Sequence, residues 1–198
     1  MTTNNKIELM APAGNFESLQ AALDNGCDSV YFGVEQLNMR ARASVNFTMD
    51  DLAEIAKRCE AKNVRSYLTL NTIIYDHDLS VVKTLINKAK EANITAVIAS
   101  DQAVIAMARS VGMEVHISTQ LNVTNIETIK FYSLFADTMV LSRELSLRQV
   151  KKITEQIEKE QIKGPNGNLV EIEIFGHGAL CMAVSGKCYL SLHSHNSS

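Results

Sequence analysis

The chain has 198 residues, of which 46% are hydrophobic and 21% charged, with two prolines and no tryptophan. This composition is ordinary for a globular protein and excludes collagen-like, disordered and coiled-coil chains. The formal net charge is −3, so no overall positive field draws the chain to nucleic acid or to a membrane. Any contact with RNA would need a local basic cluster.

No apolar run approaches the roughly 20 residues needed to span a bilayer. The polar segment Met1–Lys6 does not resemble a signal peptide. We therefore expect a cytoplasmic protein without a membrane partner. In that reducing compartment cysteines rarely form structural disulfides, and Cys27 and Cys59 fall on segments of helical pattern, which predicts buried thiols.

Short β-type runs alternate with segments of helical periodicity along the whole chain. Strands are predicted at residues 7–10, 29–32, 64–70, 95–99, 114–117, 138–141 and 170–175. The apolar stripes of the helices between them lie within residues 16–23, 52–59, 82–89, 104–108, 126–132 and 150–157. Thr48 and Asp101 are predicted N-caps, and Gly26 and Gly112 are predicted to end helices. Turns are predicted at residues 12–14 and 163–168.

This strict alternation predicts parallel strands covered by helices. Two architectures compete, an open doubly wound sheet and a TIM-type (β/α)8 barrel. Small or polar residues follow nearly every predicted strand, from Pro12 to Gly178, and this spread favours the barrel, which collects ligand groups from many strand ends. No GxGxxG motif follows the first strand, which argues against a dinucleotide site.

A complete barrel of this type has eight strands and about 250 residues. Because seven strands are predicted here, we expect residues 1–198 to form an N-terminal barrel domain that is truncated after about seven β/α units. Unpaired strand edges in such a domain make a homo-oligomer plausible.

Cys181 and Cys188 lie seven residues apart in a glycine-rich stretch. Glycines allow the backbone to approach a thiolate closely, and amide N–H groups can hydrogen-bond to sulfur and tune a metal cluster. The pair therefore suggests metal or redox chemistry. The spacing alone is weak support, and two thiols packed beneath a loop are the alternative.

The stretch from Glu171 to Ser191 resembles the signature of the U32 peptidase family, the collagenase-like proteases. The matching residues are Glu173, Phe175, Gly178, Ala179, Leu180, Cys181, Gly186, Cys188, Leu190 and Ser191. Other stretches are similar to the same family and extend the resemblance over essentially the whole chain: residues 11–14, 31–33, 39–42, 46–47, 118–122 and 143–146.

The resemblance implies two different activities. The family has a protease name, yet better understood members act in oxygen-independent hydroxylation of a tRNA uridine, an rRNA cytidine or the ubiquinone ring. It further implies a four-iron four-sulfur cluster in the full-length protein, with Cys181 and Cys188 as two of its ligands. The other two cysteines are expected just after Ser198, so we expect neither catalysis nor a stably bound cluster on this chain alone. Prephenate is the implied co-substrate, and tRNA or another RNA is the implied partner.

Two alternatives to RNA hydroxylation stay open. A collagenase-like peptidase would act on a polypeptide substrate, and a non-catalytic binding or scaffold domain would have no substrate. The chain has neither an HExxH nor a GxSxG motif. His177 lies four residues before Cys181 and is a candidate base for a cysteine nucleophile, although proximity within a glycine loop supports such a pair only weakly.

Candidate substrate-binding residues follow several strands. Arg40 and Arg42 share one face of the loop after the second strand, and their forked guanidinium groups suit a dicarboxylate such as prephenate or an RNA phosphate. Alternatively, Arg40 and Arg42 are ordinary surface arginines that keep this loop solvated and bind no ligand. Three further candidates lie at the expected barrel mouth, namely Gln120, Asn122 and Arg143. The alternative role for these residues is to brace the loops there.

Roles are also predicted for three further residues on or just after the predicted strands. His116 lies on the fifth strand and is predicted to be a core histidine with satisfied hydrogen bonds. His177 is expected either to bind or to hydrogen-bond to backbone. Glu173 is predicted to be an arginine partner or an ordinary strand residue.

Overall fold

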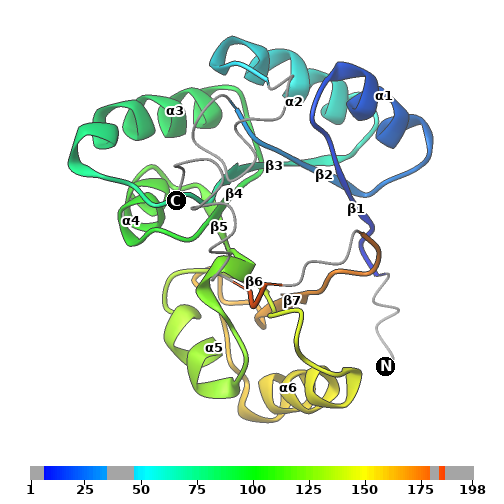
Figure 1. Ribbon diagram of the computed structural model, residues 1–198, viewed down its shortest axis with the longest axis vertical. Helices are drawn as coiled ribbons and strands as arrows, with labels where there is room; N and C mark the ends of the chain where they lie inside the picture. The colour runs from blue at the N-terminus through cyan, green and yellow to red at the C-terminus, as the bar shows by residue number, and fades with distance from the viewer. Residues whose placement is uncertain (1–6, 35–46, 179–182, 186–198) are drawn as a thin grey trace.

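The computed structural model describes residues 7–34, 47–178 and 183–185. Within these residues seven parallel strands form one sheet, in the spatial order β1-β2-β3-β4-β5-β6-β7. The sheet curls into a half-barrel with helices around its outside, and β1 and β7 form its two edges (Figure 1). The predicted barrel architecture with about seven β/α units is confirmed.

The elements follow the predicted alternation closely. The strands are β1 (Met10–Pro12), β2 (Ser29–Phe32), β3 (Arg65–Leu70), β4 (Ala96–Ala99), β5 (Glu114–Ile117), β6 (Thr138–Val140) and β7 (Glu171–Glu173). The α-helices are α1 (Phe16–Asp24), α2 (Leu52–Glu60), α3 (Leu79–Glu91), α4 (Gln102–Ser110), α5 (Ile126–Tyr132) and α6 (Leu147–Glu160). Short 3₁₀ turns are η1 (Met49–Asp51), η2 (Asp76–Asp78) and η3 (Thr119–Leu121).

The N-cap predicted at Asp101 is confirmed, whereas the one predicted at Thr48 caps the 3₁₀ turn that precedes α2 and not α2 itself. Asp101 Oδ1 accepts the Ala103 N–H at 2.8 Å and so satisfies an amide that the first turn of α4 leaves free. Thr48 caps the turn η1 that leads into α2, and its N–H donates to Asp51 Oδ2 at 2.7 Å. Gly26 and Gly112, the predicted helix ends, have φ values of +78° and +69°, which glycine adopts without a steric penalty.

The main hydrophobic core lies between the sheet and the helices. It combines strand residues such as Leu68 and Val97 with the predicted helix stripes, for example Leu85 of α3. Cys27 and Cys59 belong to this core and are free thiols, as predicted. Burial raises the pKa of the Cys59 thiol to about 11, which removes its nucleophilic character at neutral pH.

The inner face of the curled sheet forms a second, smaller apolar cluster. It comprises Tyr67, Ala96 and Ile98, with Met10 and Tyr31 packed against them. These residues alternate along their strands with members of the main core, because successive strand side chains point to opposite faces. Side chains in this phase therefore line the interior of the half-barrel.

The first strand lies further along the chain than predicted. Residues 7–10 were expected, but β1 spans Met10–Pro12, and Ile7 is 90% exposed. Pro12, expected in a turn, is tolerated in β1 because this strand is at the sheet edge and pairs only with β2. The apolar side chain of Ile7 therefore did not indicate a strand, because this residue is exposed and lies before β1.

The last strand is shorter than predicted. Residues 170–175 were expected, whereas β7 spans Glu171–Glu173 and pairs only with β6 among the described strands. Ile174 and Phe175 follow it and are about half exposed. The turn predicted at residues 163–168 is confirmed and is closed by a 2.9 Å hydrogen bond from Gly164 N to Asn168 O.

Across the described ranges, none of the helices combines the length and the apolar character that crossing a membrane requires.

Candidate functional site

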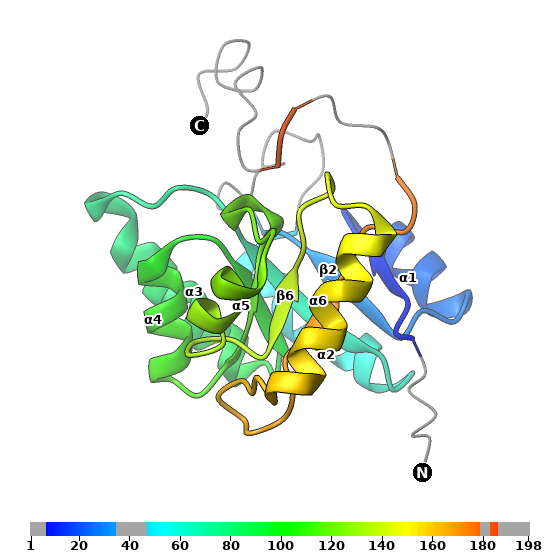
Figure 2. The same ribbon diagram turned by 90° about the horizontal axis from the view of Figure 1, so that it is seen from below.

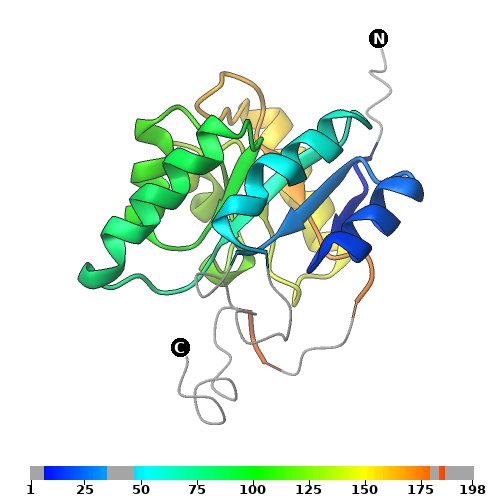
Figure 3. The same ribbon diagram turned by 90° about the horizontal axis from the view of Figure 1, so that it is seen from above.

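The carboxyl ends of parallel strands meet at one end of the half-barrel, which we call the mouth. Figure 2 shows residues 174–178 and 183–185 at this end, and the 163–168 turn at the opposite end. In the reverse view of Figure 3 the picture is upside down, with residues 174–178 and 183–185 below the sheet and the 163–168 turn above it, so both views place them at opposite ends of the half-barrel. Residues predicted to bind substrate or metal should therefore gather at the mouth.

One well-defined contact at the mouth is made by Arg143, which follows β6. Its backbone N–H and its Nε both donate to Ser185 Oγ, at 3.3 and 3.4 Å. Its Nη2 donates to the carbonyl oxygen of Ala183 at 3.4 Å. Arg143 thus braces the segment 183–185 with part of its donor set, one of the two roles predicted for it.

The neighbouring Glu144 holds the same segment from a second side. Its Oε1 accepts the N–H of Ser185 at 2.8 Å, and Ser185 is completely buried. Partial burial acts to raise the pKa of Glu144, but the hydrogen bonds from Ser185 and the Arg143 charge outweigh it and hold the pKa below its usual value. The loop between β6 and α6 therefore fixes the segment 183–185, which in the sequence lies between Cys181 and Cys188.

Gln120 and Asn122 lie in and just after η3, which follows β5 at the mouth. Asn122 has φ +53°, in the left-handed region, and its Oδ1 accepts the Ser142 hydroxyl at 3.4 Å. Asn122 thus links the loops after β5 and β6. Gln120 is partly buried and donates its backbone N–H to Ser118 Oγ at 3.3 Å.

The described signature residues near the mouth have different environments. His177, Phe175 and Gly178 are exposed, whereas Glu173 is partly buried at the end of β7. Several predicted site residues lie outside the described residues: Arg40, Arg42, Ala179, Leu180, Cys181, Gly186, Cys188, Leu190 and Ser191.

The described cysteines do not fit a metal centre. Cys27 and Cys59 lie in the core on the helix side of the sheet, and burial raises the pKa of both thiols. Within residues 7–34, 47–178 and 183–185, no group of three or more histidine, cysteine or acidic residues is placed to hold a metal ion. The other two cysteines of the sequence are Cys181 and Cys188, which lie outside the described residues.

Sequence reasoning missed a polar cluster inside the half-barrel. His116 is 3% exposed, and its Nε2 lies 3.1 Å from Glu114 Oε1. Its ring lies 4.6 Å from that of Tyr67, centroid to centroid. The Tyr67 hydroxyl donates to Glu8 Oε1 at 2.8 Å, and Arg65 forms an ion pair with Glu8.

The prediction that His116 has satisfied hydrogen bonds is wrong for one of its two ring nitrogens. Its Nδ1 is buried and has no hydrogen-bond partner among the described residues. Such an atom is uncommon, because most buried polar atoms are paired. The alternation of residues 114–117 indicated that Glu114 and His116 share a face, but the sequence could not indicate which groups lie opposite them.

The pKa values of the two interior carboxyl groups, Glu114 and Glu173, shift in opposite directions. The hydrogen bond from His116 holds the pKa of Glu114 below its usual value, against the effect of burial, and the charges of His116 and Arg65 contribute. Burial raises the pKa of Glu173, an effect that the charge of His116 partly offsets. Burial also raises the pKa of Tyr67 to about 12, so its phenol keeps its proton at neutral pH.

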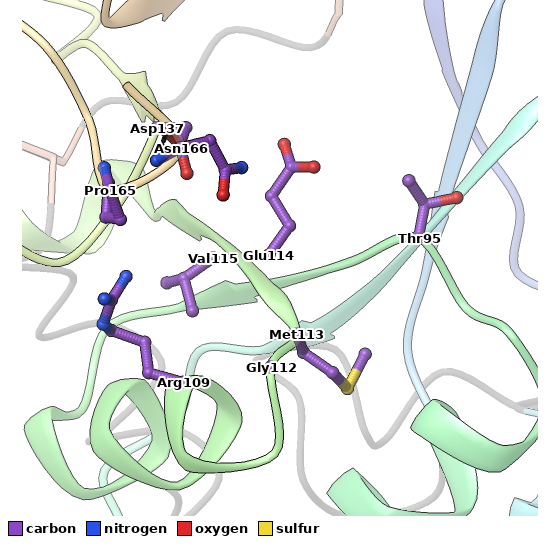
Figure 4. A pocket seen from close by; sticks show the side chains of 9 residues that line it. All are labelled: Thr95, Arg109, Gly112, Met113, Glu114, Val115, Asp137, Pro165 and Asn166. Atoms are coloured by element: carbon purple, nitrogen blue, oxygen red, sulfur yellow. Dashed lines mark hydrogen bonds between the residues drawn. The ribbon is translucent and has the colours of Figure 1, made fainter. Parts of the chain in front are cut away.

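A pocket of about 370 Å³ opens at the end of the half-barrel opposite the mouth. It is lined by residues that precede or begin β4 to β7, including Arg109, Glu114, Asp137 and Asn166, and the Glu114 side chain projects into it (Figure 4). Glu114 therefore borders this pocket and the buried His116 at once.

These observations define a parallel β/α half-barrel whose mouth carries polar loops and holds the segment between two cysteines. Comparison with known proteins agrees with this class. The sequence matches the model of peptidase family U32 over residues 14–198, and the chain belongs to this family.

Relatives in the family have two kinds of name. A protein of Porphyromonas gingivalis called collagenase is 58% identical over 194 residues, which are 98% of this chain and 47% of the relative. The tRNA hydroxylation protein P1 of Bacillus subtilis is 32% identical over 191 residues, 95% of this chain and 42% of the relative. This chain thus spans about half the length of the curated relatives it matches.

The fold is shared with solved structures at low sequence identity. The U32 peptidase Mk0906 aligns with a TM-score of 0.64 at 14% identity, covering 88% of this chain and 69% of that one. At this identity the likeness supports the fold alone.

Proposed function

We propose that this chain is the barrel domain of an iron–sulfur enzyme that hydroxylates a uridine in tRNA, with prephenate as co-substrate. The observation that supports it most is the fixed segment 183–185 at the mouth, which two cysteines of the family signature flank in the sequence. The relative named tRNA hydroxylation protein P1 matches 95% of the chain, including this region.

The donor set agrees with such a cofactor. Thiolates are the usual ligands of iron–sulfur clusters, and the resemblance to the family signature names Cys181 and Cys188, whereas Cys27 and Cys59 lie in the hydrophobic core. Cys181 and Cys188 would supply half of a four-cysteine set. When bound, the cluster supplies one-electron chemistry at the mouth.

The residues of this chain then have defined tasks. Arg143 and Glu144 position the cysteine segment through the hydrogen bonds to Ala183 and Ser185. Gln120 and Asn122 place amide groups at the mouth, where they can hydrogen-bond to a nucleobase or a carboxylate. Positioning of this kind accounts for a large share of enzymatic rate enhancement.

Binding of tRNA by a chain of net charge −3 requires positive charge at particular places rather than an overall field. Arg40 and Arg42 are the proposed contacts, either to RNA phosphates or to the two carboxylates of prephenate. A forked guanidinium group can bind both kinds of oxygen pair.

The test is mass spectrometry of tRNA nucleosides from bacteria that lack their own tRNA hydroxylation protein and express the whole protein. We expect hydroxylated uridine to return, to disappear with Cys181→Ala, and to persist with Cys59→Ala, which alters a core thiol. If the nucleoside is absent although the protein is folded and expressed, the proposal is wrong.

A peptidase is the second candidate, and the 58% identical relative named collagenase favours it. The two described cysteines, Cys27 and Cys59, are poor candidates for its nucleophile, because both are buried and have raised pKa values. Incubation of the purified protein with denatured collagen decides the matter. Cleavage that persists in the double variant Cys181→Ala, Cys188→Ala would favour a peptidase that is independent of these cysteines.

A further inference from the structure

Two aromatic rings in the loop between β3 and α3 are exposed and parallel to each other. The rings of Tyr75 and His77 lie 5.8 Å apart, centroid to centroid, with an angle of 2° between their planes. Tyr75 is 54% exposed, and the side chain of His77 is 80% exposed. Because burial of an aromatic ring is normally favourable, a stacked pair that is left in solvent is a candidate contact for a partner.

Hydrogen bonds hold this loop in shape before any ligand is bound. The Tyr75 N–H donates to Asp78 Oδ2 at 3.0 Å, and the Tyr75 carbonyl oxygen accepts the Asp78 N–H at 2.8 Å, which closes the turn η2 around His77. One residue earlier, the Ile74 N–H donates to Asp101 Oδ2 at 3.4 Å. The turn that carries both rings is thus fixed in advance, so a ligand that binds to them has little of the chain to order.

The pair lies at the mouth end of the half-barrel. It follows the carboxyl end of β3, and Figures 2 and 3 show the loop before α3 at the same end as residues 174–178 and 183–185. Further apolar side chains are about half exposed at this end, namely Ile73, Phe175 and Val184. A large substrate such as a tRNA that binds at the mouth can therefore also contact the Tyr75–His77 pair.

The geometry and the charge of the pair favour a flat, uncharged group. A planar ring continues the stack on an outer face of the pair with full overlap, whereas a puckered ring or an aliphatic chain overlaps it only in part. Phosphate groups are disfavoured, because the carboxylates of Asp76 and Asp78 belong to the same turn and would repel them. A nucleobase meets both conditions, since its π-face is uncharged and its phosphate lies on the backbone, away from the ring.

We propose that Tyr75 and His77 form a stacking site for an unpaired nucleobase of the RNA substrate, apart from the place where the target uridine reacts. The site rests on the proposed function, because it takes tRNA as the substrate and names one way in which the protein holds it. Unpaired bases of RNA loops stack readily on aromatic side chains, because their faces are free. Arg40 and Arg42 would then supply the electrostatic part of binding, and the Tyr75–His77 pair a part that does not depend on charge.

The first experiment measures the affinity of the whole protein for a fluorescein-labelled oligouridylate by fluorescence anisotropy at low salt. Tyr75→Ala should weaken binding by about 5- to 150-fold, the range for the loss of one base–aromatic stack. Tyr75→Phe keeps the ring and should bind as the wild type does. His77→Ala should also weaken binding, because the base stacks on a pair of rings. An affinity that neither alanine variant changes would overturn the site.

Phe131→Ala is the matched control, since Phe131 is 56% exposed in the last turn of α5, away from the mouth. It should leave the affinity unchanged. Stacking releases no counterions, so the slope of log Kd against log salt concentration should be the same in Tyr75→Ala and in the wild type. A shallower slope in Tyr75→Ala, or an equal loss of affinity in Phe131→Ala, would contradict stacking. Circular dichroism shows whether each variant is folded.

The second experiment locates the contact directly. An oligouridylate that carries 5-iodouridine is irradiated in complex with the whole protein, and the excited base forms a carbon–carbon bond to an aromatic ring against it with loss of hydrogen iodide. Mass spectrometry of the digested protein should find the crosslink on the peptide that contains Tyr75 and His77. Crosslinks that occur only on other peptides would overturn the site.

These results separate the stacking site from the proposed function. Weakened RNA binding in Tyr75→Ala, together with tRNA that the wild type leaves unhydroxylated, would support the site and contradict the proposed function. Hydroxylated tRNA together with an unchanged affinity in Tyr75→Ala and His77→Ala would contradict the site alone. A wild-type protein that binds a proline-rich, collagen-type peptide through Tyr75, and no oligouridylate, would overturn the site as an RNA contact and assign the pair to a polypeptide.

Discussion

Glu173 belongs to the family signature and is partly buried at the end of β7. Burial raises its pKa, so the native state disfavours the carboxylate form. Such a group stabilises the fold fully below its unfolded pKa, and this contribution is lost as the pH rises through the folded pKa.

Glu173→Gln should therefore stabilise the protein at pH 7, by on the order of 1 kcal/mol, because glutamine has no charge to bury. The gain should vanish below the usual glutamate value of 4.5, where the wild-type carboxyl group is protonated in both states. Urea unfolding at pH 7 and near pH 4 measures both. A gain of equal size at the two pH values would contradict the assigned cause.

Individual residues also mark where prediction from sequence succeeds. The burial of Cys27 and Cys59 followed from their places on apolar stripes, which is a local property. The half-satisfied state of His116 did not follow, because its surroundings come from three strands that are far apart in the sequence. For the same reason the task of Arg143 could be narrowed only to two choices.

At the scale of elements, capping fixes where helices begin. Asp101 satisfies the Ala103 amide and also accepts the Ile74 N–H at 3.4 Å, so it joins the loop after β3 to the start of α4. Asp101→Ala should lower the free energy of unfolding by about 1 kcal/mol. Asp101→Asn keeps an acceptor oxygen and should cost much less; equal losses in thermal unfolding would argue against the cap.

A close backbone approach fixes the turn before β7. A Cβ atom at Gly164 would lie 2.8 Å from the Asp137 Cα, which is closer than real contacts allow. Gly164→Ala should therefore destabilise the protein by about 1–3 kcal/mol. Gly14→Ala is the control, because a Cβ there meets nothing within 4 Å; if both variants unfold at the same urea concentration, the steric account is wrong.

The order and type of the elements were predictable because both periodicities, near two and near 3.6 residues, are strong in this sequence. The errors lie at β1 and β7. Each is an edge strand that pairs on one side only in the described sheet, so apolar residues such as Ile7 and Phe175 extend past the paired region. Pairing depends on neighbours, which the local pattern does not contain.

At the scale of the whole molecule, the curled sheet separates two environments. Its outer side carries the hydrophobic core and both buried thiols, whereas its interior carries the titratable cluster and opens at the mouth. Exposed strand edges favour association between sheets. A homo-oligomer therefore stays a prediction for this domain.

The proposed function depends on the segment held at the mouth. The segment 183–185 is fixed there by Arg143 and Glu144, and the cysteines on either side of it in the sequence are the proposed ligands of iron. The central claim is therefore that these two thiols, and not those of the core, bind a cluster.

The most direct test is the iron and acid-labile sulfide content of the whole protein after anaerobic purification. We predict about four iron atoms per chain with cluster-type visible absorption, lost in Cys181→Ala and in Cys188→Ala and retained in Cys59→Ala. Protein that is free of iron yet hydroxylates tRNA, or iron content that is unchanged in Cys181→Ala, would contradict the account.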